Sequence, residues 1–117
     1  MSIQKSIALR AKKRALRNRK KMMSRGSKLR VSIFRSLHHI GAQIIDDVKK
    51  HTILSLSSSI TSFDGDKTSV ARQVGIALGE QAAKQDIKDV FFDRGQYKYH
   101  GRVQAFAEGL RESGLQF

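Results

Sequence analysis

Cysteine is absent from the 117 residues of this chain, and acidic residues are absent from its first 30 positions. The lack of cysteine excludes a disulfide framework and thiolate chemistry, and it fits a reducing environment. No apolar run is long enough to span a bilayer. Residues 1–30 hold 12 lysines and arginines, which leaves 11 basic and all 10 acidic residues for the remainder. The sequence therefore predicts one nearly neutral globular domain that carries a strongly cationic arm.

The cationic arm predicts a polyanionic partner, because it carries almost all of the formal net charge of +13. Nucleic acid is the commonest such partner. Met1–Met23 has no glycine or proline, so we expect repulsion to fray it in free solution and phosphate contact to order it as a helix. An organelle transit peptide and a membrane-surface helix are the alternatives. Sparse serine counts against the first, and a thin apolar face counts against the second. Ser24–Ser27 is predicted to be a short hinge.

The hydrophobic pattern of the remainder predicts a small α/β domain. Apolar alternation indicates strands and helical spacing indicates helices. The predicted elements are strands over Leu29–Arg35, Ile40–Val48 and Thr52–Ser57, a helix over Lys67–Gln85, a buried strand over Asp89–Phe92, and a helix from about Val103 to Gly114. Short connections favour an antiparallel meander of the first three strands, and the crossover helix favours a parallel fourth strand.

Several single residues have predicted structural roles in this domain. Asp66 is placed to cap the first helix of the domain. Gly75 and Gly79 weaken that helix but permit it to pack closely on a sheet. Leu115 and Phe117 are expected to fold back onto the core.

The stretch FFDRGQYKYHGR, Phe91–Arg102, interleaves two tyrosines with cationic side chains. Such a mixture suits RNA, because rings stack on bases while cations bind phosphates. The alternative is a solvated loop whose tyrosines merely cover the edge of the core. The stretch alone does not decide between these interpretations.

Metal-dependent catalysis is disfavoured by the spacing of the candidate ligands. Adjacent residues on a strand point to opposite faces, and aspartates are common in turns for local hydrogen bonding. The histidines lack metal-ligand spacing, and no glycine-rich phosphate loop opens a helix. We therefore predict no catalytic residues, no metal and no cofactor. The candidates weighed were Asp46, Asp47, Asp64, Asp66, Asp93, His38, His39, His51 and His100.

Three stretches carry a resemblance to a known family. RVSIFRS with HI.AQIIDD, then TILSLSSS, then FDRGQYKYHGRVQAFAEGLRESGLQF resemble bacterial-type large-subunit ribosomal protein L-eighteen, over essentially the whole chain. The resemblance implies a non-enzymatic protein of the cytoplasmic large ribosomal subunit. It would bind 5S rRNA in the central protuberance and help attach it to 23S rRNA, beside ribosomal protein L-five and other central-protuberance proteins. It implies no membrane and no small-molecule substrate.

The resemblance also implies a fold and a set of RNA-binding residues. The fold is a mixed four-stranded sheet of order 3-2-1-4 with a ribonuclease H-like core, two helices and a basic arm, divided into residues 1–27 and 28–117. The arm and domain entry would contribute Arg10, Lys12, Lys13, Arg14, Arg17, Arg19, Lys20, Lys21, Arg25, Lys28 and Arg30. The first hairpin would contribute Arg35, Ser36, His39 and Gln43. The later loop would contribute Arg94, Tyr97, Lys98, Tyr99, His100 and Arg102.

Four positions depart from the family pattern. Gly41 stands where an aromatic residue is usual, so a stacking or packing contact is expected to be lost. Leu37 and His38 replace a more polar, basic pair. Gln96 stands where glycine is usual, which puts the geometry of that turn in question. Two other functions stay open: a ribonuclease H-like metal-dependent nuclease and a non-specific nucleic-acid-binding protein.

Overall fold

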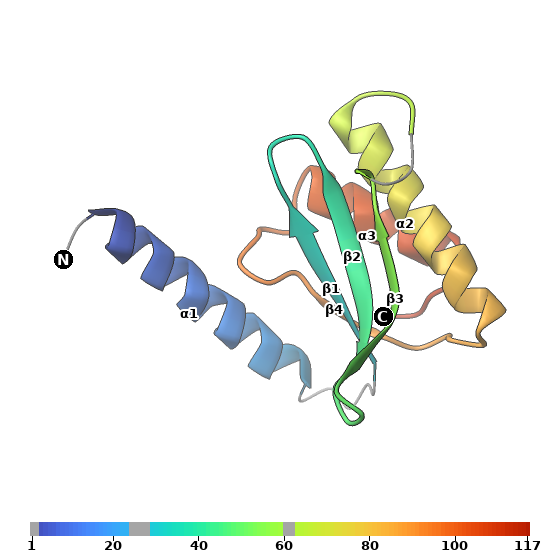
Figure 1. Ribbon diagram of the computed structural model, residues 1–117, viewed down its shortest axis with the longest axis horizontal. Coiled ribbons are helices and arrows are strands. Elements are labelled where there is room, and N and C mark those ends of the chain that lie inside the picture. Colours follow the sequence, from blue (N-terminus) through green and yellow to red (C-terminus); the bar gives the residue numbers. More distant parts are fainter. Residues whose placement is uncertain (1–2, 24–28, 60–62) are drawn as a thin grey trace.

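The computed structural model describes residues 3–23, 29–59 and 63–117 (Figure 1). Four strands form one sheet in the order β3-β2-β1-β4. In chain order the elements are α1 (Ile3–Met23), β1 (Leu29–Arg35), β2 (Ile40–Asp46), β3 (His51–Ser57), α2 (Lys67–Lys84), β4 (Phe91–Asp93) and α3 (Arg102–Glu112). β1 pairs antiparallel with β2, β2 pairs antiparallel with β3, and β4 runs parallel to β1. The predicted strand order and the parallel fourth strand are confirmed.

The described residues form three helices rather than the two predicted beside an arm, because the arm is itself helical over Ile3–Met23. Figure 1 shows α1 projecting from the body, and among the described residues α1 contacts the body at β4. Whether α1 frays in free solution, and whether the domain division falls at residue 27, stay predictions. The proposed hinge Ser24–Ser27 lies outside the described residues.

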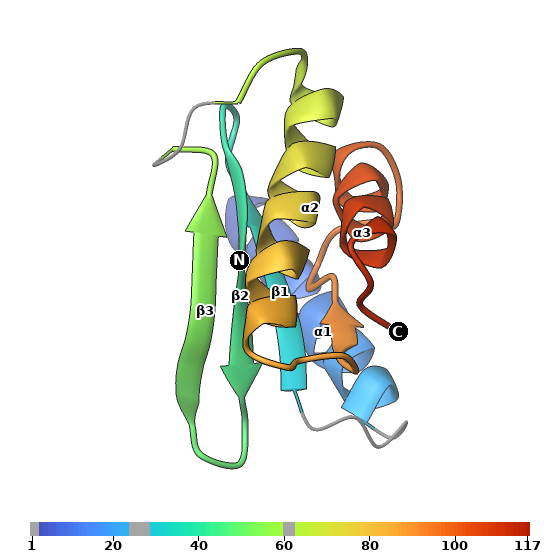
Figure 2. The same ribbon diagram turned by 90° about the vertical axis from the view of Figure 1, so that its right-hand side faces the viewer.

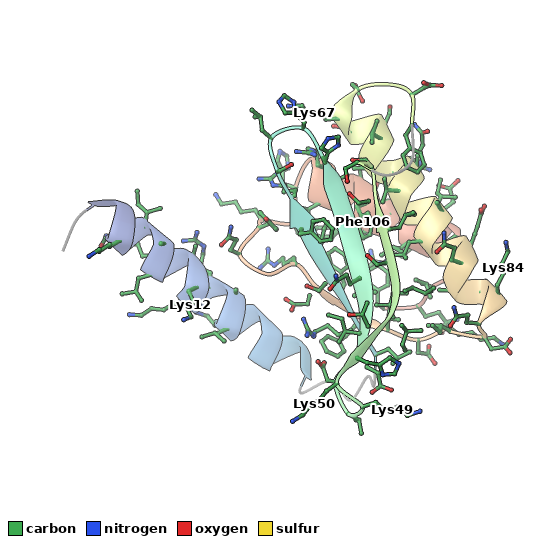
Figure 3. The ribbon with its side chains drawn as sticks, in the orientation of Figure 1. Lys12, Lys49, Lys50, Lys67, Lys84 and Phe106 are labelled. Atoms are coloured by element: carbon green, nitrogen blue, oxygen red, sulfur yellow. The ribbon has the colours of Figure 1, made fainter. Side chains whose placement is uncertain are left out.

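Helices α2 and α3 both lie on one face of the sheet (Figure 2). Val31 and Ile33 of β1 and Ile40 and Ala42 of β2 turn toward those helices and are buried. Alternate residues turn to the other face, which we call the free face. Phe106 of α3 lies behind the sheet in the centre of the core (Figure 3) and is completely buried.

Polar contacts fix the ends of the elements. Asp66 caps α2 as predicted, accepting a hydrogen bond from the Ser69 amide at 2.8 Å, and this bond lowers the pKa of Asp66. β2 ends at Asp46, two residues earlier than predicted. The Asp46 carboxylate accepts from the amides of Val48 and Lys49, which turns the chain out of the strand.

The fourth strand also begins later than predicted, because the chain end pairs with the residues before it. Gln116 forms a bridge with Asp89, its amide donates to the Lys88 carbonyl at 2.8 Å, and its carbonyl accepts from Val90. β4 therefore spans Phe91–Asp93 instead of Asp89–Phe92. The predicted return of the C-terminus is confirmed. Leu115 is buried, and the Phe117 ring stacks on Phe92 with 5.5 Å between centroids.

The glycines of α2 serve a helix contact, which corrects the prediction that they pack on the sheet. A Cβ at Gly75 would lie 2.3 Å from the carbonyl oxygen of Phe106 in α3. A Cβ at Gly109 of α3 would lie equally close to the carbonyl oxygen of Arg72 in α2. The two backbones therefore touch at reciprocal glycines, and the buried stripe of α2 includes Gly75 and Gly79.

We predict that Gly75→Ala destabilises the protein although alanine favours helices. The added methyl group would meet backbone atoms that cannot rotate away, and overpacking of this kind costs about 1–3 kcal/mol. Urea unfolding measures the change, with Glu80→Ala, on the exposed side of α2, as the matched control. A Gly75→Ala protein as stable as the control would contradict the close approach.

Candidate nucleic-acid interface

Arg35, at the carboxyl end of β1, contacts Tyr97, which lies 62 positions later in the loop after β4. The Tyr97 hydroxyl accepts from the Arg35 amide and donates to the Arg35 carbonyl, both at 3.3 Å. The guanidinium carbon of Arg35 lies 4.9 Å from the centre of the Tyr97 ring, a cation–π geometry. Tyr97 also packs against the core. These contacts favour the packing interpretation for Tyr97, which fastens the loop to the end of β1.

Arg102, the first residue of α3, reaches the same place. Its Nη1 donates to the Ser36 carbonyl at 3.0 Å, while its Nε is buried without a hydrogen-bond partner. Desolvation lowers the pKa of Arg102, and the positive charge of Arg35 lowers it further. Within the described ranges, neither of these two guanidiniums forms an ion pair. Two adjacent cations without a carboxylate favour the binding of an anion.

The hairpin between β1 and β2 is held by its own side chains. The Ser36 hydroxyl accepts from the His39 amide at 3.2 Å, and the Ser36 amide donates to the His39 carbonyl at 2.8 Å. His39 Nδ1 lies 3.3 Å from the Ser58 hydroxyl, which also accepts from the Ile40 amide. Ser36 and His39 nevertheless stay exposed, so the turn presents fixed polar groups to solvent.

The loop after β4 presents its cations on a defined backbone. Gly95 and Gly101 have φ of 61° and 58°, values that favour glycine. Gln96 has no positive φ, so a residue other than glycine is accommodated at that position without backbone strain. The Tyr99 side chain is 40% exposed, and its hydroxyl accepts from Arg111 at 3.4 Å. Among the other predicted residues, Lys98 and His100 are exposed, and Arg94 and Gln43 are half-buried.

Arg30 has an internal partner set that the sequence did not reveal. Its Nε and Nη2 each donate to Asp47 at 3.1 Å, and its Nη1 donates to Asp93 at 3.1 Å. The Arg30 side chain is 11% exposed and that of Asp93 is 1% exposed. Burial lowers the pKa of Arg30, but the bonds and charges of Asp47 and Asp93 outweigh burial and leave that pKa raised. Arg30 therefore ties β1 to the β2–β3 turn and to β4.

The carboxylate considered for a nuclease is thus engaged by an arginine. Asp93 accepts from Arg30, and its second oxygen accepts from the Gly95 amide at 2.9 Å. Across the described ranges, no group of three or more histidine or acidic side chains is arranged to hold a metal ion. The arrangement offers recognition of an anion instead of hydrolysis.

The cationic arm presents its charges outward. Of the predicted arm residues, Arg10, Lys12, Lys13, Arg14 and Arg17 are exposed, and Lys12 points away from α1 in Figure 3. The helix continues through Arg19, Lys20 and Lys21, whose side chains are not described. Arg25 and Lys28 lie outside the described residues. In the parts of the chain that are described, no helix is both long and apolar enough to cross a membrane.

Fold and surface together define a small basic α/β protein of the kind that binds nucleic acid. Residues 5–117 match the family described as ribosomal L18 of archaea, bacteria, mitochondria and chloroplast. The chain is 59% identical over 102 residues to large ribosomal subunit protein uL18 of Thermus thermophilus, covering 87% of this chain and 88% of the relative. It is 48% identical over 108 residues to the protein of that name from Deinococcus radiodurans, covering 90% and 94%.

The chain therefore belongs to the ribosomal L18 family. It is a structural, non-enzymatic protein of the large ribosomal subunit, and its partners are ribosomal RNA and ribosomal proteins. This membership removes the nuclease interpretation.

We predict that Arg30→Ala lowers the free energy of unfolding by about 3–5 kcal/mol, because it breaks the ion pair between Arg30 and the buried Asp93. Adding Asp93→Asn should recover part of the loss, since the buried negative charge that Arg30 binds is then removed. Lys98→Ala, at an exposed site, serves as the control and should change stability by less than about 0.5 kcal/mol. A stability loss no larger than that of the control would show that Arg30 is not an internal tie.

Proposed function

We propose that this chain binds 5S rRNA and helps to attach it to 23S rRNA in the central protuberance, beside ribosomal protein L-five and other proteins of that region. The observation that carries the proposal is the pair Arg35 and Arg102. Their guanidiniums lie close together, where β1 ends and α3 begins. In the described ranges, neither forms an ion pair with a carboxylate. Exposed cations of α1 and of the loop after β4 extend this basic surface.

The parts of the chain have different roles in the proposed complex. The α1 cations neutralise phosphates and release counterions, which supplies affinity with little sequence preference. The hairpin and the loop supply position, because their backbones are fixed by Tyr97, Ser36 and Ser58. RNA is read by its shape, its 2′-hydroxyls and its unstacked bases, since side chains cannot enter the A-form major groove.

A competition experiment tests the proposal directly. Labelled 5S rRNA is bound to the chain and challenged with unlabelled transfer RNA or duplex DNA. We expect neither competitor to displace 5S rRNA at equal nucleotide concentration. Equal displacement by all three would instead support the non-specific nucleic-acid-binding alternative.

The arm should control the salt dependence of binding. In the 117-residue chain, replacing Lys12, Lys13 and Arg14 with glutamine should reduce the log–log salt slope by about 2–3, because each lost phosphate contact removes about 0.9. Removing residues 1–23 should flatten the slope further. Replacing Lys49, Lys50 and Lys84, exposed lysines of the body, provides a control of equal charge. An unchanged slope in the arm variant would exclude arm–phosphate contact.

The two tyrosines of the loop should behave differently on mutation. Tyr99→Ala should weaken 5S rRNA binding by about 1–3 kcal/mol if a base stacks on its exposed ring, and Tyr99→Phe should retain most of the affinity. Tyr97→Ala should instead lower thermal stability, because it removes the bonds to Arg35. Filter binding and thermal melts of both variants measure this division. Unchanged affinity of Tyr99→Ala would assign Tyr99 to packing.

A further inference from the structure

The free face of the sheet carries an exposed aromatic ring at the carboxyl end of β1. Val31 and Ile33 turn toward α2 and α3 and are buried, whereas Phe34 turns to the opposite face and is 43% exposed. Figure 2 shows that α2 and α3 both lie on the other side of the sheet. In the described ranges, Phe34 is the one large apolar side chain of a strand that is exposed.

The ring rests on a glycine of the neighbouring strand. Phe34 is the register partner of Gly41 in the β1–β2 pair. A Cβ at Gly41 would lie 2.6 Å from Cζ and 2.9 Å from Cε2 of Phe34, so the outer edge of the ring covers the glycine. A cross-strand ring commonly fills the place that a glycine leaves on a sheet. Gly41 itself is buried, so the ring is supported from below while much of it remains accessible.

The groups beside the ring on the free face are polar. Arg35, the next residue, turns by strand alternation to the helical face, where it lies near Arg102. The next register pair on the free face is Ser32 with Gln43, and Gln43 is in turn the partner of Ser55 on β3. An apolar protein segment would find no continuous apolar patch here. A nucleotide would find a ring for its base, and the amide and hydroxyl groups of Gln43, Ser32 and Ser55 for its polar edges.

We propose that Phe34 is a stacking platform for one unpaired base of the bound RNA, and that Gly41 sets the pose of the ring by leaving room beneath its edge. This inference rests on the proposed function and adds a contact residue to it. A purely structural role would be to shield Gly41, which any large apolar side chain could do.

Fluorescence can detect the stack because the chain contains no tryptophan. In Phe34→Trp the indole is the sole fluorophore excited at the red edge of its absorption band. Addition of a 5S rRNA transcript should quench it to saturation, in step with binding measured by filter retention. Ala83→Trp, at an exposed site of α2 in the helical layer, is the control and should not respond. An unquenched Phe34→Trp protein that binds as tightly as wild type would overturn the proposal.

The affinity of Phe34 variants for 5S rRNA distinguishes base stacking by the ring from shielding of Gly41. Phe34→Leu keeps an apolar cover over Gly41 but has no ring, so its melting temperature should stay close to that of wild type. Its 5S rRNA complex should weaken by about 5- to 150-fold, the range expected for loss of one base–aromatic stack. Wild-type affinity in Phe34→Leu would assign the ring to shielding and refute the inference.

The outcomes for the inference and for the proposed function are distinguishable. Wild-type protein that fails to prefer 5S rRNA over transfer RNA and duplex DNA would overturn the proposed function, and the inference with it. A clear preference combined with unresponsive Phe34 variants would overturn the inference alone. An indole signal that responds to RNA-free large-subunit proteins and not to 5S rRNA would identify a protein contact, which also refutes it.

Discussion

The parallel pairing of β1 with β4 is the constraint on which the proposed binding surface depends. Because the two strands run in the same direction, their carboxyl ends lie at the same end of the sheet. The β1–β2 hairpin and the loop after β4 therefore become neighbours, although Ser36 and Arg102 are 66 residues apart in the sequence. Arg30 holds this pairing from within, since one guanidinium binds the β2–β3 turn through Asp47 and β4 through Asp93. If β4 were antiparallel to β1, the loop after β4 would lie at the opposite end of the strands, far from the β1–β2 hairpin.

The distribution of charge follows from the same arrangement. Seven of the ten acidic residues lie on or beside the helices that cover one face of the sheet: Asp64, Asp66, Glu80, Asp86, Asp89, Glu108 and Glu112. Of the other three, Asp47 and Asp93 are engaged by Arg30, and Asp46 binds turn amides. Within the described ranges, none of these carboxylates forms an ion pair with Arg35 of the hairpin or with Arg102 after the loop. The body is close to neutral overall, but Arg35 and Arg102 give the carboxyl end of β1 a local positive charge, which favours an anionic partner there.

The sequence predicted those features that depend on local patterns. β1 spans Leu29–Arg35 as the alternation indicated, Asp66 caps α2, and Val103, Phe106 and Leu110 are buried along α3. Features that depend on distant partners were missed. Nothing near Arg30 in the sequence signals two carboxylates 17 and 63 residues away, and nothing near Gly75 reveals that its neighbour is a helix. The pairing of Gln116 with residues 88–90, which shortens β4, was likewise missed. No local sequence pattern indicates which residues a chain end will pair with.

The two tyrosines illustrate how a recognition loop gains rigidity. A loop that is ordered only on binding loses conformational entropy at that moment, which reduces affinity. Tyr97 avoids part of this cost because its hydroxyl and its ring are already bound to Arg35 in the free chain. The same contact restrains the Arg35 guanidinium beside Arg102.

Arg111 restrains the other side of the loop in a similar way, since it donates to the Tyr99 hydroxyl and to the Phe117 carbonyl. The exposed groups between these two attachments, Lys98 and His100, are then offered on a backbone of fixed shape. Residues that do not touch the RNA would in this way determine how well their neighbours bind it.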